Sequence, residues 1–394
     1  MRDVVIVDSV RTGLAKSFRG SFNMTRSDDM AAHLINTLLD RNPQIEPAMV
    51  EDIILGAASQ AGEQSFNLAR MAAVLSRLPI ETTGTTVSRF CASGLQTIAM
   101  AANQIGSGYC DVLMAGGAES ISMRQRQEVG VFERNPTLIE NKPQIYMEMG
   151  QTAEVVADRY GVTREMQDVY GLQSQQRYAA AVESGAIADE IAPMTVKMKK
   201  VNRETNEESL HEVVVDKDEC NRADTTAEGL ALLKPAFREE GSVTAGNSSQ
   251  LSDGASMALV MSADKAAELG LSPMGYFRGF VTAGCEPDEM GIGPVFAVPK
   301  LLKRAGLSID DIDLWELNEA FASQCVYCRD TLGIDNDKYN VNGGSIAIGH
   351  PFGMTGARMV GHALRELKRR GGRYAVVTMC VATGEGAAGL LEAC

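Results

Sequence analysis

Histidine and tryptophan are scarce in this chain of 394 residues, which has four histidines and one tryptophan. No apolar run reaches the ~20 residues that a membrane-spanning helix needs, so we expect no membrane span. Residues Met1 to Asp8 are too few and too acidic for a secretion signal, and their pattern is typical of a buried strand. We therefore expect a cytoplasmic protein of two or three packed units.

Positive charge is also in short supply. The chain has 37 Lys and Arg against 51 Asp and Glu, a net charge of -14. Because binding to nucleic acid needs a basic surface, we expect no nucleic-acid partner. An anionic substrate would need a local basic pocket to overcome the negative field of the whole chain.

The eight cysteines follow no regular spacing, and without a secretion signal we expect reduced thiols. Cys325 and Cys328 form a C-x-x-C pair, but a zinc or redox site would need a second pair or nearby histidines. The surrounding stretch has a helical pattern. We interpret the pair as packing residues and expect no metal site.

The chain has the pattern of a duplication. Ser93-Gly94 opens a helix that ends near Gly106 and is followed by an apolar strand at 111–115. Thr355-Gly356 likewise opens a helix that ends at Gly371, and a strand at 374–378 follows. A helix, a glycine stop and an apolar strand are typical of α/β units, so the fold class is α/β with two similar halves, each a sheet covered by helices.

A polar, charged segment from about Glu119 to Gly241 interrupts this pattern. Thr163 is placed to cap a helix, and residues 197–218 alternate charged and apolar residues, which predicts exposed strands or a long loop. We therefore divide the chain into an N-terminal half at 1–118 and 242–269, an inserted domain at 119–241, and a C-terminal half at 270–394. An insertion of this size is usually functional.

Cys91 stands in the frame Ser88-Arg89-Phe90-Cys91-Ala92-Ser93-Gly94, directly before a predicted helix. Unpaired backbone N–H groups at a helix start favour the thiolate, which is the nucleophilic form of cysteine. A buried structural cysteine is the alternative, since free cysteines are often buried.

His350 stands between Gly349 and Pro351, which hold it on a rigid bend. A histidine held in this way suits a general base for a neighbouring thiol. If the halves are duplicates, Cys91 and His350 lie at equivalent helix-opening turns and face each other near a pseudo-twofold axis.

Cys380 ends a strand and precedes the turn Val381-Ala382-Thr383-Gly384, at the edge of the sheet where α/β active sites lie. Its thiol can exchange a proton, and the N–H groups of the turn can face a thioester oxygen. Asn318 follows another strand, where its amide can hold a water or an oxyanion, or cap a helix.

These frames resemble those of the thiolase family, enzymes that cleave or form 3-ketoacyl-CoA, over nearly the whole chain. The matching motifs are Ser88 to Gln96, Gly116-Gly117-Ala118-Glu119-Ser120, Met149 to Glu154, Lys234-Pro235-Ala236-Phe237, Gly246-Asn247, Asn318-Glu319-Ala320-Phe321, Gly349-His350-Pro351 and Cys380. The resemblance implies a five-layered α-β-α-β-α core of two thiolase-like halves, with the inserted loop domain gripping coenzyme A.

The resemblance also implies roles for the catalytic residues. Cys91 takes the acyl group, His350 activates it, and Cys380 moves a proton at the α-carbon of the second acetyl group. Asn318 holds a water that stabilises one thioester oxyanion together with His350. The backbone N–H groups of Cys91 and Ala382 serve the other oxyanion.

For the substrate, the resemblance implies that Arg222, Phe237 and Ser249 contact CoA. An arginine is suited to phosphate, and it would supply the local positive charge that this acidic chain needs. CoA and acyl-CoA are then substrates, and no permanently bound cofactor is expected. Members of the family are usually dimers or tetramers, so we expect a homodimer or homotetramer.

Three positions depart from the family pattern. Ala382 stands where glycine is common, and Glu385 where a neutral residue is frequent, so that Glu385 either raises nearby pKa values or points outward. Glu148-Met149 replaces the His-Met pair of many short-chain biosynthetic members, which favours the broader 3-ketoacyl-CoA-cleaving type. The alternatives are a short-chain biosynthetic acetyl-CoA acetyltransferase, a decarboxylating ketosynthase, which would need a second active-site histidine, and a non-catalytic acyl-CoA-binding subunit.

Overall fold

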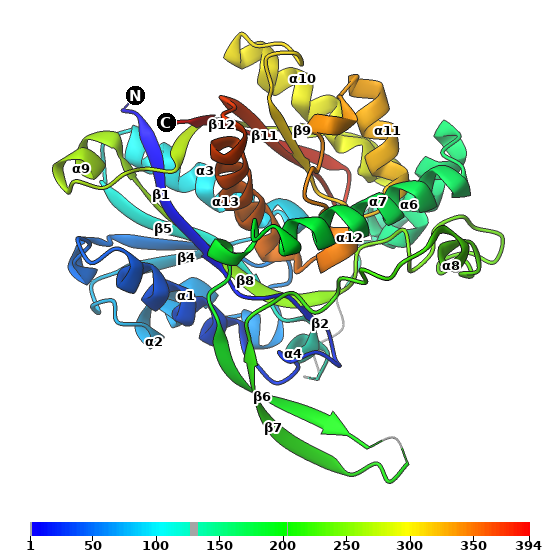
Figure 1. The fold of residues 1–394 in the computed structure, drawn as a ribbon, viewed down its shortest axis with the longest axis horizontal. Coiled ribbons are helices and arrows are strands. Elements are labelled where there is room, and N and C mark those ends of the chain that lie inside the picture. The colour runs from blue at the N-terminus through cyan, green and yellow to red at the C-terminus, as the bar shows by residue number, and fades with distance from the viewer. Residues whose placement is uncertain (1, 127–132, 203) are drawn as a thin grey trace.

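One mixed sheet runs through the whole molecule. The computed structural model describes residues 2–126, 133–202 and 204–394. In this part of the chain a ten-stranded sheet has the order β10-β11-β12-β9-β1-β8-β5-β3-β4, and β2 pairs with β8 (Figure 1). The strands are β1 (Val4–Arg11), β2 (Ala15–Lys16), β3 (Asp52–Gly56), β4 (Thr83–Val87), β5 (Val112–Glu119), β8 (Ser252–Ser262), β9 (Gly275–Gly284), β10 (Leu314–Leu317), β11 (Tyr374–Val381) and β12 (Glu385–Ala393).

The sheet consists of two halves with the same strand order. The first half reads β1-β8-β5-β3 from the centre outward and the second reads β9-β12-β11-β10. The halves join where Val5 pairs with Tyr276 and Ile6 with Gly275. In the first half β4 continues the sheet beyond β3, and in the second half a single bridge from Trp315 to Tyr339 takes that place. The predicted duplication is confirmed.

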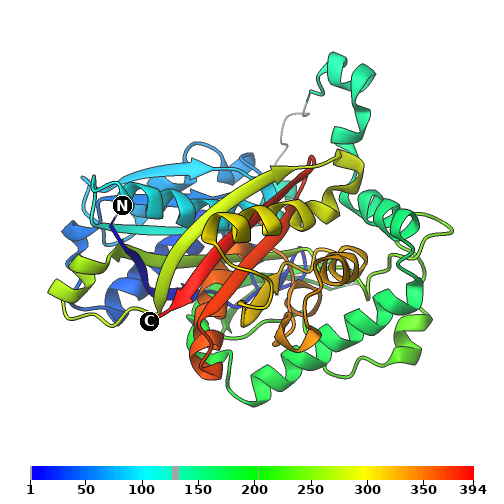
Figure 2. The same ribbon diagram turned by 90° about the horizontal axis from the view of Figure 1, so that it is seen from above.

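Helices form three layers around the two half-sheets. The outer layers are α1 (Ser27–Arg41) with α2 (Leu68–Leu75), and α10 (Gly293–Ala305) with α11 (Ala322–Leu332). Their apolar faces form separate cores against the first and second half-sheets. Between the half-sheets lie α3 (Ser93–Gly106) and α13 (Phe352–Arg370), whose apolar residues share one core with both sheets (Figure 2). This is the predicted five-layered arrangement.

Glycines let α3 and α13 cross in close contact near their first turns. A Cβ on Gly94 would lie 2.7 Å from the Ala357 nitrogen, and one on Gly356 would lie 2.5 Å from the Leu95 nitrogen. Real Cβ atoms do not approach backbone atoms so closely, so only glycine fits at these two positions. The crossing brings the residues that precede the two helices to the same region of the molecule.

The segment between β5 and β8 leaves the sheet. It contains α6 (Met149–Tyr160), the long α7 (Arg164–Glu183), the hairpin β6 (Met194–Val201) with β7 (Glu208–Val215), and α8 (Ala227–Ala231). Its helices α6 and α7 pack against α11. Shorter elements are α4 (Ile121–Arg126), α5 (Pro136–Asn141), α9 (Ala263–Glu268) and α12 (Ser345–Ile348). Thr163 caps α7 as predicted, and the hairpin extends away from the body of the protein (Figure 1). The domain boundaries stay a prediction, and the predicted insert includes residues 127–132 and 203, which lie outside the described part.

Two further expectations concern single elements. Cys325 and Cys328 are fully buried in α11 within the outer core, so they are packing residues as predicted. No helix in the described ranges is long and apolar enough to cross a bilayer.

Candidate active site

Cys91 lies in the short turn η3 (Phe90–Ala92), directly before α3. Phe90 has φ +44°, a left-handed conformation that is uncommon for a residue other than glycine. Ser93 Oγ accepts the Arg89 N–H at 2.8 Å and donates to the Phe90 carbonyl at 2.7 Å. The Cys91 side chain is only 7% exposed. The turn therefore presents the sulfur from a constrained backbone in a buried place.

Burial controls the ionisation of Cys91. It raises the pKa of the thiol to about 12, and the nearby carboxylate of Glu119 adds to the shift, whereas the backbone N–H groups of Cys91 and Ala382 lower it. The backbone N–H groups favour the thiolate in the predicted direction, but the loss of water around the sulfur outweighs them and the net pKa is raised. The resting group is a neutral thiol, which needs a base.

Glu119 lies near Cys91 and connects the two halves of the molecule. Its carboxylate accepts the Ala58 N–H at 2.8 Å, the Gly353 N–H at 2.9 Å and the Gln64 amide at 2.7 Å. Gly353 belongs to the first turn of α13, so one buried carboxylate contacts the loop after β3 and the helix that follows His350.

His350 lies two residues before α13 and is 2% exposed. Burial, followed by the positive charge of Arg358, lowers the pKa of its imidazole to about 3. The ring is therefore neutral at physiological pH, the form that can accept a proton. The backbone N–H of His350 donates to the backbone carbonyl of Gln250 at 2.9 Å, and this hydrogen bond fixes the bend that carries the ring.

Hydrogen bonds select one tautomer of His350. Ser345 Oγ donates to Asn318 Oδ1 at 2.6 Å, so the amide of Asn318 faces His350 Nε2 with an N–H, at 3.1 Å. On the other side Nδ1 lies 2.7 Å from Thr355 Oγ1, which itself donates to the Pro351 carbonyl at 2.9 Å. Nδ1 therefore carries the proton and Nε2 carries the lone pair.

Asn318 does not cap a helix. Its N–H donates to the Thr378 carbonyl at 3.0 Å, and α11 begins only at Ala322, after Phe321 at the N-cap position. Of the two predicted roles, the capping role is wrong and the amide faces the imidazole.

Cys380 is fully buried near the end of β11. Burial raises the pKa of its thiol well above the usual range, and the nearby Cys91 adds to the shift. It shares an apolar cluster with Ala320 and Phe321, next to Asn318. A series of neighbours runs from Cys91 to Ala382 and Cys380, from Cys380 through its cluster with Ala320 to the segment that bears Asn318, and from the Asn318 amide to His350. All four candidate catalytic residues are buried.

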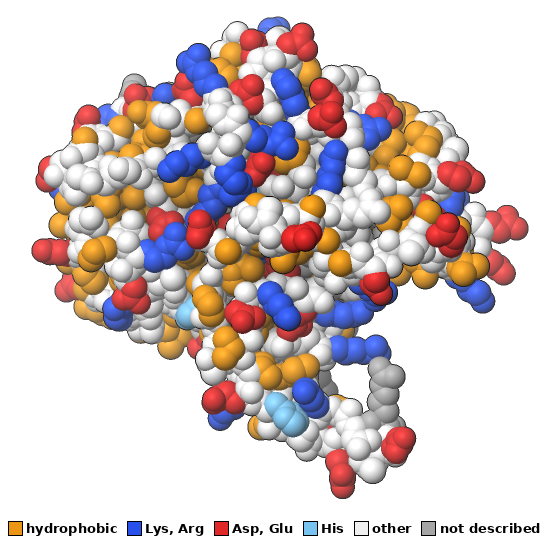
Figure 3. Space-filling model, viewed as in Figure 1, with side chains coloured by type: hydrophobic (Ala, Val, Ile, Leu, Met, Phe, Trp, Pro, Cys, Tyr) orange, Lys and Arg blue, Asp and Glu red, His pale blue; other side chains and the backbone are white. Residues whose placement is uncertain are grey.

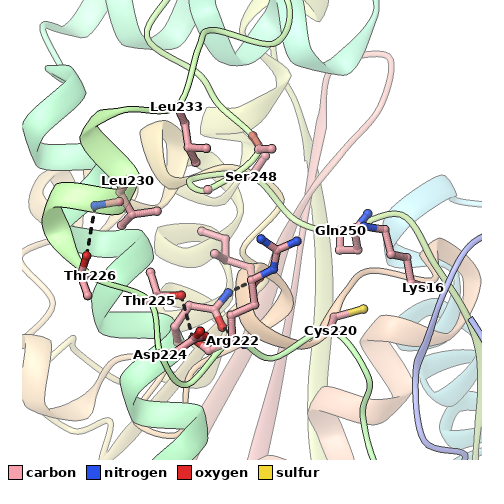
Figure 4. Close-up of a pocket in the computed structure, with 15 residues that line it drawn as sticks. Lys16, Cys220, Arg222, Asp224, Thr225, Thr226, Leu230, Leu233, Ser248 and Gln250 are labelled. Atoms are coloured by element: carbon pink, nitrogen blue, oxygen red, sulfur yellow. Dashed lines mark hydrogen bonds between the residues drawn. The ribbon is translucent and has the colours of Figure 1, made fainter. Parts of the chain in front are cut away.

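A cavity of about 460 Å³ opens beside this region, within the size range of small-molecule sites (Figure 4). It lies between the insert and the core. Its lining includes Lys16, Cys220, Arg222, Thr226, Leu230, Leu233, Ser248 and Gln250. Gln250 also accepts the N–H of His350, so the cavity wall is continuous with the bend of the imidazole.

Two cations and one carboxylate, Asp224, line this cavity in a chain of net charge -14. Neither Arg222 nor Lys16 forms an ion pair with a carboxylate in the described part of the chain, so both are available to an anion. Ser249 and Phe237 lie beside the lining. Ser249 N–H donates to the Ala320 carbonyl at 2.9 Å, and the Phe237 ring meets Phe321 edge to face at 5.9 Å.

Comparison with known proteins agrees with this geometry. The family "Thiolase, N-terminal domain" matches residues 4–264 and "Thiolase, C-terminal domain" matches residues 271–393. The chain belongs to the thiolase family. A Bacillus subtilis (strain 168) protein named 3-ketoacyl-CoA thiolase is 46% identical over 395 residues, covering 100% of both chains. The peroxisomal 3-ketoacyl-CoA thiolase B of Mus musculus is 44% identical over 99% of this chain and 91% of its own.

A solved structure is similar throughout. The Bacillus anthracis acetyl-CoA acetyltransferase superposes with a TM-score of 0.89 at 40% identity, over 100% of this chain and 99% of that one. The family, the fold and the enzyme class predicted from the sequence, an acyltransferase of the thiolase type, are confirmed.

Sequence reasoning on this thiolase missed Lys16, Ser248 and Gln250 in the cavity. Lys16 ends the two-residue strand β2, which pairs with β8 at Ser252 and Asp253. No local pattern around Lys16 indicates that pairing, because its partner lies more than 230 residues away. Glu385, predicted either to affect pKa values or to point outward, forms an ion pair with Arg89.

Proposed function

We propose that this thiolase cleaves 3-ketoacyl-CoA with CoA, and catalyses the reverse condensation, through an acyl thioester on Cys91. The observation that supports the proposal is the series of neighbours that links Cys91, Cys380 and Asn318 to His350, all four of them buried. The 3-ketoacyl-CoA thiolases of Bacillus subtilis and Mus musculus, to which the chain is similar along its length, support the same substrate class.

The first half-reaction begins with two neutral groups. The Cys91 sulfur attacks the 3-keto carbon while His350 Nε2 takes the thiol proton, so that neither group has to ionise alone in a buried site. The bond between C2 and C3 then breaks. Its electron pair remains on the acetyl-CoA fragment as an enolate, and the shortened acyl group stays on sulfur.

Cys380 completes that step by giving its proton to C2 of the enolate. A thiol with a raised pKa holds its proton until a strong base forms beside it, which suits this role. In the second half-reaction the Cys380 thiolate takes the thiol proton of CoA and returns to its neutral form, while the CoA sulfur attacks the acyl thioester. The released Cys91 sulfur recovers a proton from the imidazolium, and acyl-CoA leaves.

Two sets of donors serve the developing oxyanions. The backbone N–H groups of Cys91 and Ala382 already lower the pKa of the Cys91 thiol, so they face the place where negative charge forms. Asn318 and His350 stand together and would hold a water at the second thioester oxygen. Ala382 has a methyl group where glycine is common in the family, but its backbone N–H can still serve the oxyanion.

The cavity beside the site is our proposed binding site for CoA. Arg222 and Lys16 would bind phosphate oxygens, and Leu230 and Leu233 give one wall an apolar surface. Ser249 and Phe237 would contact the substrate from the flank of the cavity. CoA enters as a substrate, and the proposal includes no metal.

Three further properties belong to this proposal. The chain works in the cytoplasm, as a homodimer or homotetramer, without a nucleic-acid partner. β4 is an edge strand, and Phe66 and Ile80 near it are 90% and 66% exposed, which supports self-association. On the face seen in Figure 3 basic side chains are interspersed with acidic ones, unlike the basic stripe of a nucleic-acid binder. We also propose that the chain consists of an N-terminal half at 1–118 and 242–269, an inserted domain at 119–241, and a C-terminal half at 270–394.

The test is turnover on a series of 3-ketoacyl-CoA thioesters of increasing chain length, with CoA as the second substrate. We expect acetyl-CoA and the acyl-CoA shortened by two carbons, both identified by mass spectrometry. Turnover confined to the four-carbon substrate would favour the acetyl-CoA acetyltransferase type, the activity named for the similar Bacillus anthracis structure. Tight CoA binding without turnover on any member would contradict the proposal and favour a binding subunit.

A further inference from the structure

An ion pair joins the two loops that surround the reacting sulfur. The Arg89 guanidinium binds the Glu385 carboxylate across 296 positions of sequence, and Arg89 Nε also donates to Gln96 Oε1 in α3 at 2.8 Å. The two charged side chains are 30% and 36% exposed. In the described part of the chain, neither forms an ion pair with any other residue.

Both joined loops have unusual backbone conformations. Phe90, between Arg89 and Cys91, has φ +44°. In the other loop Thr383 has φ +75° and Gly384 has φ +95°. Non-glycine residues in this region persist only where surrounding contacts hold them, and such residues collect at functional sites.

The loop that bears Glu385 is fixed on its far side. Cys285 N–H donates to the Gly384 carbonyl at 2.8 Å, and a Cβ on Gly386 would lie 2.0 Å from the Gly293 carbonyl oxygen. This hairpin therefore cannot shift toward α10. The ion pair between Arg89 and Glu385 therefore holds the Cys91 turn against the hairpin that bears Glu385, which is itself fixed.

The contact between the loops includes the proposed reaction centre. Ala382 N–H faces the Cys91 sulfur, and Cys380 lies at the start of the same hairpin. A change in the spacing of the two loops would move an oxyanion donor and both thiols relative to each other. Misplacement of reacting groups by about 1 Å can cost about 100-fold in rate.

We propose that Arg89 and Glu385 are positioning residues for acyl transfer, whose ion pair sets the distance between the Cys91 turn and the 382–384 turn. This inference rests on the proposed function, because it concerns the rate at which Cys91 is acylated. It assigns a role to Glu385, a position where a neutral residue is frequent in the family.

The experiment is single-turnover acetylation by acetyl-CoA, quenched and read as the fraction of chain that gains an acetyl group on the Cys91 peptide. Four proteins are compared: wild type, Glu385→Gln, the charge-swapped Arg89→Glu/Glu385→Arg variant, and the control Arg278→Gln. Arg278 lies on β9, is also 30% exposed, and pairs with Asp3 and Glu392.

We expect Glu385→Gln to lower the acetylation rate constant about tenfold at an unchanged half-saturating concentration of acetyl-CoA, since binding is unaffected. The swapped variant should recover to within about threefold of wild type, because the attraction is restored. Arg278→Gln should match wild type. Raising the salt from about 0.05 M to about 0.5 M should slow wild type at saturating acetyl-CoA and leave Glu385→Gln unchanged, since a partly exposed pair is screened.

A Glu385→Gln rate within twofold of wild type, together with a wild-type rate that does not depend on salt, would overturn the positioning role and leave the proposed function intact. A swapped variant that is folded by circular dichroism and as slow as Glu385→Gln would also overturn it. Absence of acetyl on Cys91 in wild type would overturn both.

Discussion

Cys91 and His350 occupy equivalent places, directly before α3 and α13, yet the two turns are held in different ways. The imidazole is fixed by side chains, with Asn318 on one ring nitrogen and Thr355 on the other. In the described part of the chain the sulfur accepts hydrogen bonds from the backbone N–H groups of Cys91 and Ala382. Hydrogen bonds of Ser93 and the Arg89–Glu385 ion pair hold its turn.

The difference follows from what each group does. A base needs a defined tautomer, and side-chain hydrogen bonds supply it. A nucleophile that carries an acyl group needs free space around the sulfur and donors aimed at the thioester oxygen, which backbone N–H groups supply without filling the site. The same helix-opening turn in the two halves therefore serves two purposes.

The largest effect should come from removing the base. His350→Asn keeps a polar side chain that cannot accept the thiol proton, and we expect Cys91 acetylation to slow by about 10³-fold. Single-turnover mass spectrometry measures the rate. His33→Asn, in α1, is the matched control and should behave as wild type. A His350→Asn rate within tenfold of wild type would mean that another group activates the sulfur.

The Cys380→Ser variant should distinguish the role of the Cys380 thiol from that of the Cys91 thiol. We expect acetylation of Cys91 to continue, while condensation of two acetyl-CoA molecules falls by about 10²- to 10³-fold, because a serine hydroxyl is a poorer proton carrier than a thiol. Product analysis by mass spectrometry checks both steps on one sample. Cys110→Ser, outside the site, should leave both unchanged. Undiminished condensation in Cys380→Ser would assign the proton transfer elsewhere.

Thr355→Val should disturb the tautomer without removing the base. It leaves His350 Nδ1–H without its acceptor at nearly the same side-chain volume, and we expect about 10- to 100-fold lower kcat with little change in KM. Thr355→Ser restores the hydroxyl and should return most of the activity. Equal kcat values for the valine and serine variants would show that this hydrogen bond does not govern the reaction.

The smallest expected effect is that of pH on acylation. The pKa of His350 is lowered to about 3 and that of Cys91 is raised to about 12, so the base is neutral above the first value and the thiol neutral below the second. The acetylation rate constant should therefore be flat between about pH 5 and about pH 9. A bell-shaped profile centred near neutrality would indicate a resting thiolate–imidazolium pair instead.

The sequence predicted most of the fold because its signals are local. Glycine stops and apolar strands recur in the same order in both halves, and the glycines at 94 and 356 mark the helix starts that bring Cys91 and His350 together. The ionisation of Cys91 could not be predicted in the same way. It depends on burial by the second half and on Glu119, which no pattern around Cys91 reveals.

Long-range partners account for the remaining differences. Glu385 was visible as a departure from the family pattern, but its partner Arg89 lies at the other end of the chain. Asparagine is a residue type that often caps helices. The backbone N–H of Asn318, however, donates to the Thr378 carbonyl on the neighbouring strand, and the helix begins only at Ala322. In both positions a contact between strands or loops far apart in sequence decides the outcome.

The most direct measurement is peptide mass spectrometry of the wild-type protein after brief exposure to acetyl-CoA and acid quench. The account predicts a gain of one acetyl group on the peptide that contains Cys91, and loss of that group when CoA is added before the quench. An acetyl group carried by another cysteine, or one on Cys91 that CoA does not remove, would contradict acyl transfer through this sulfur.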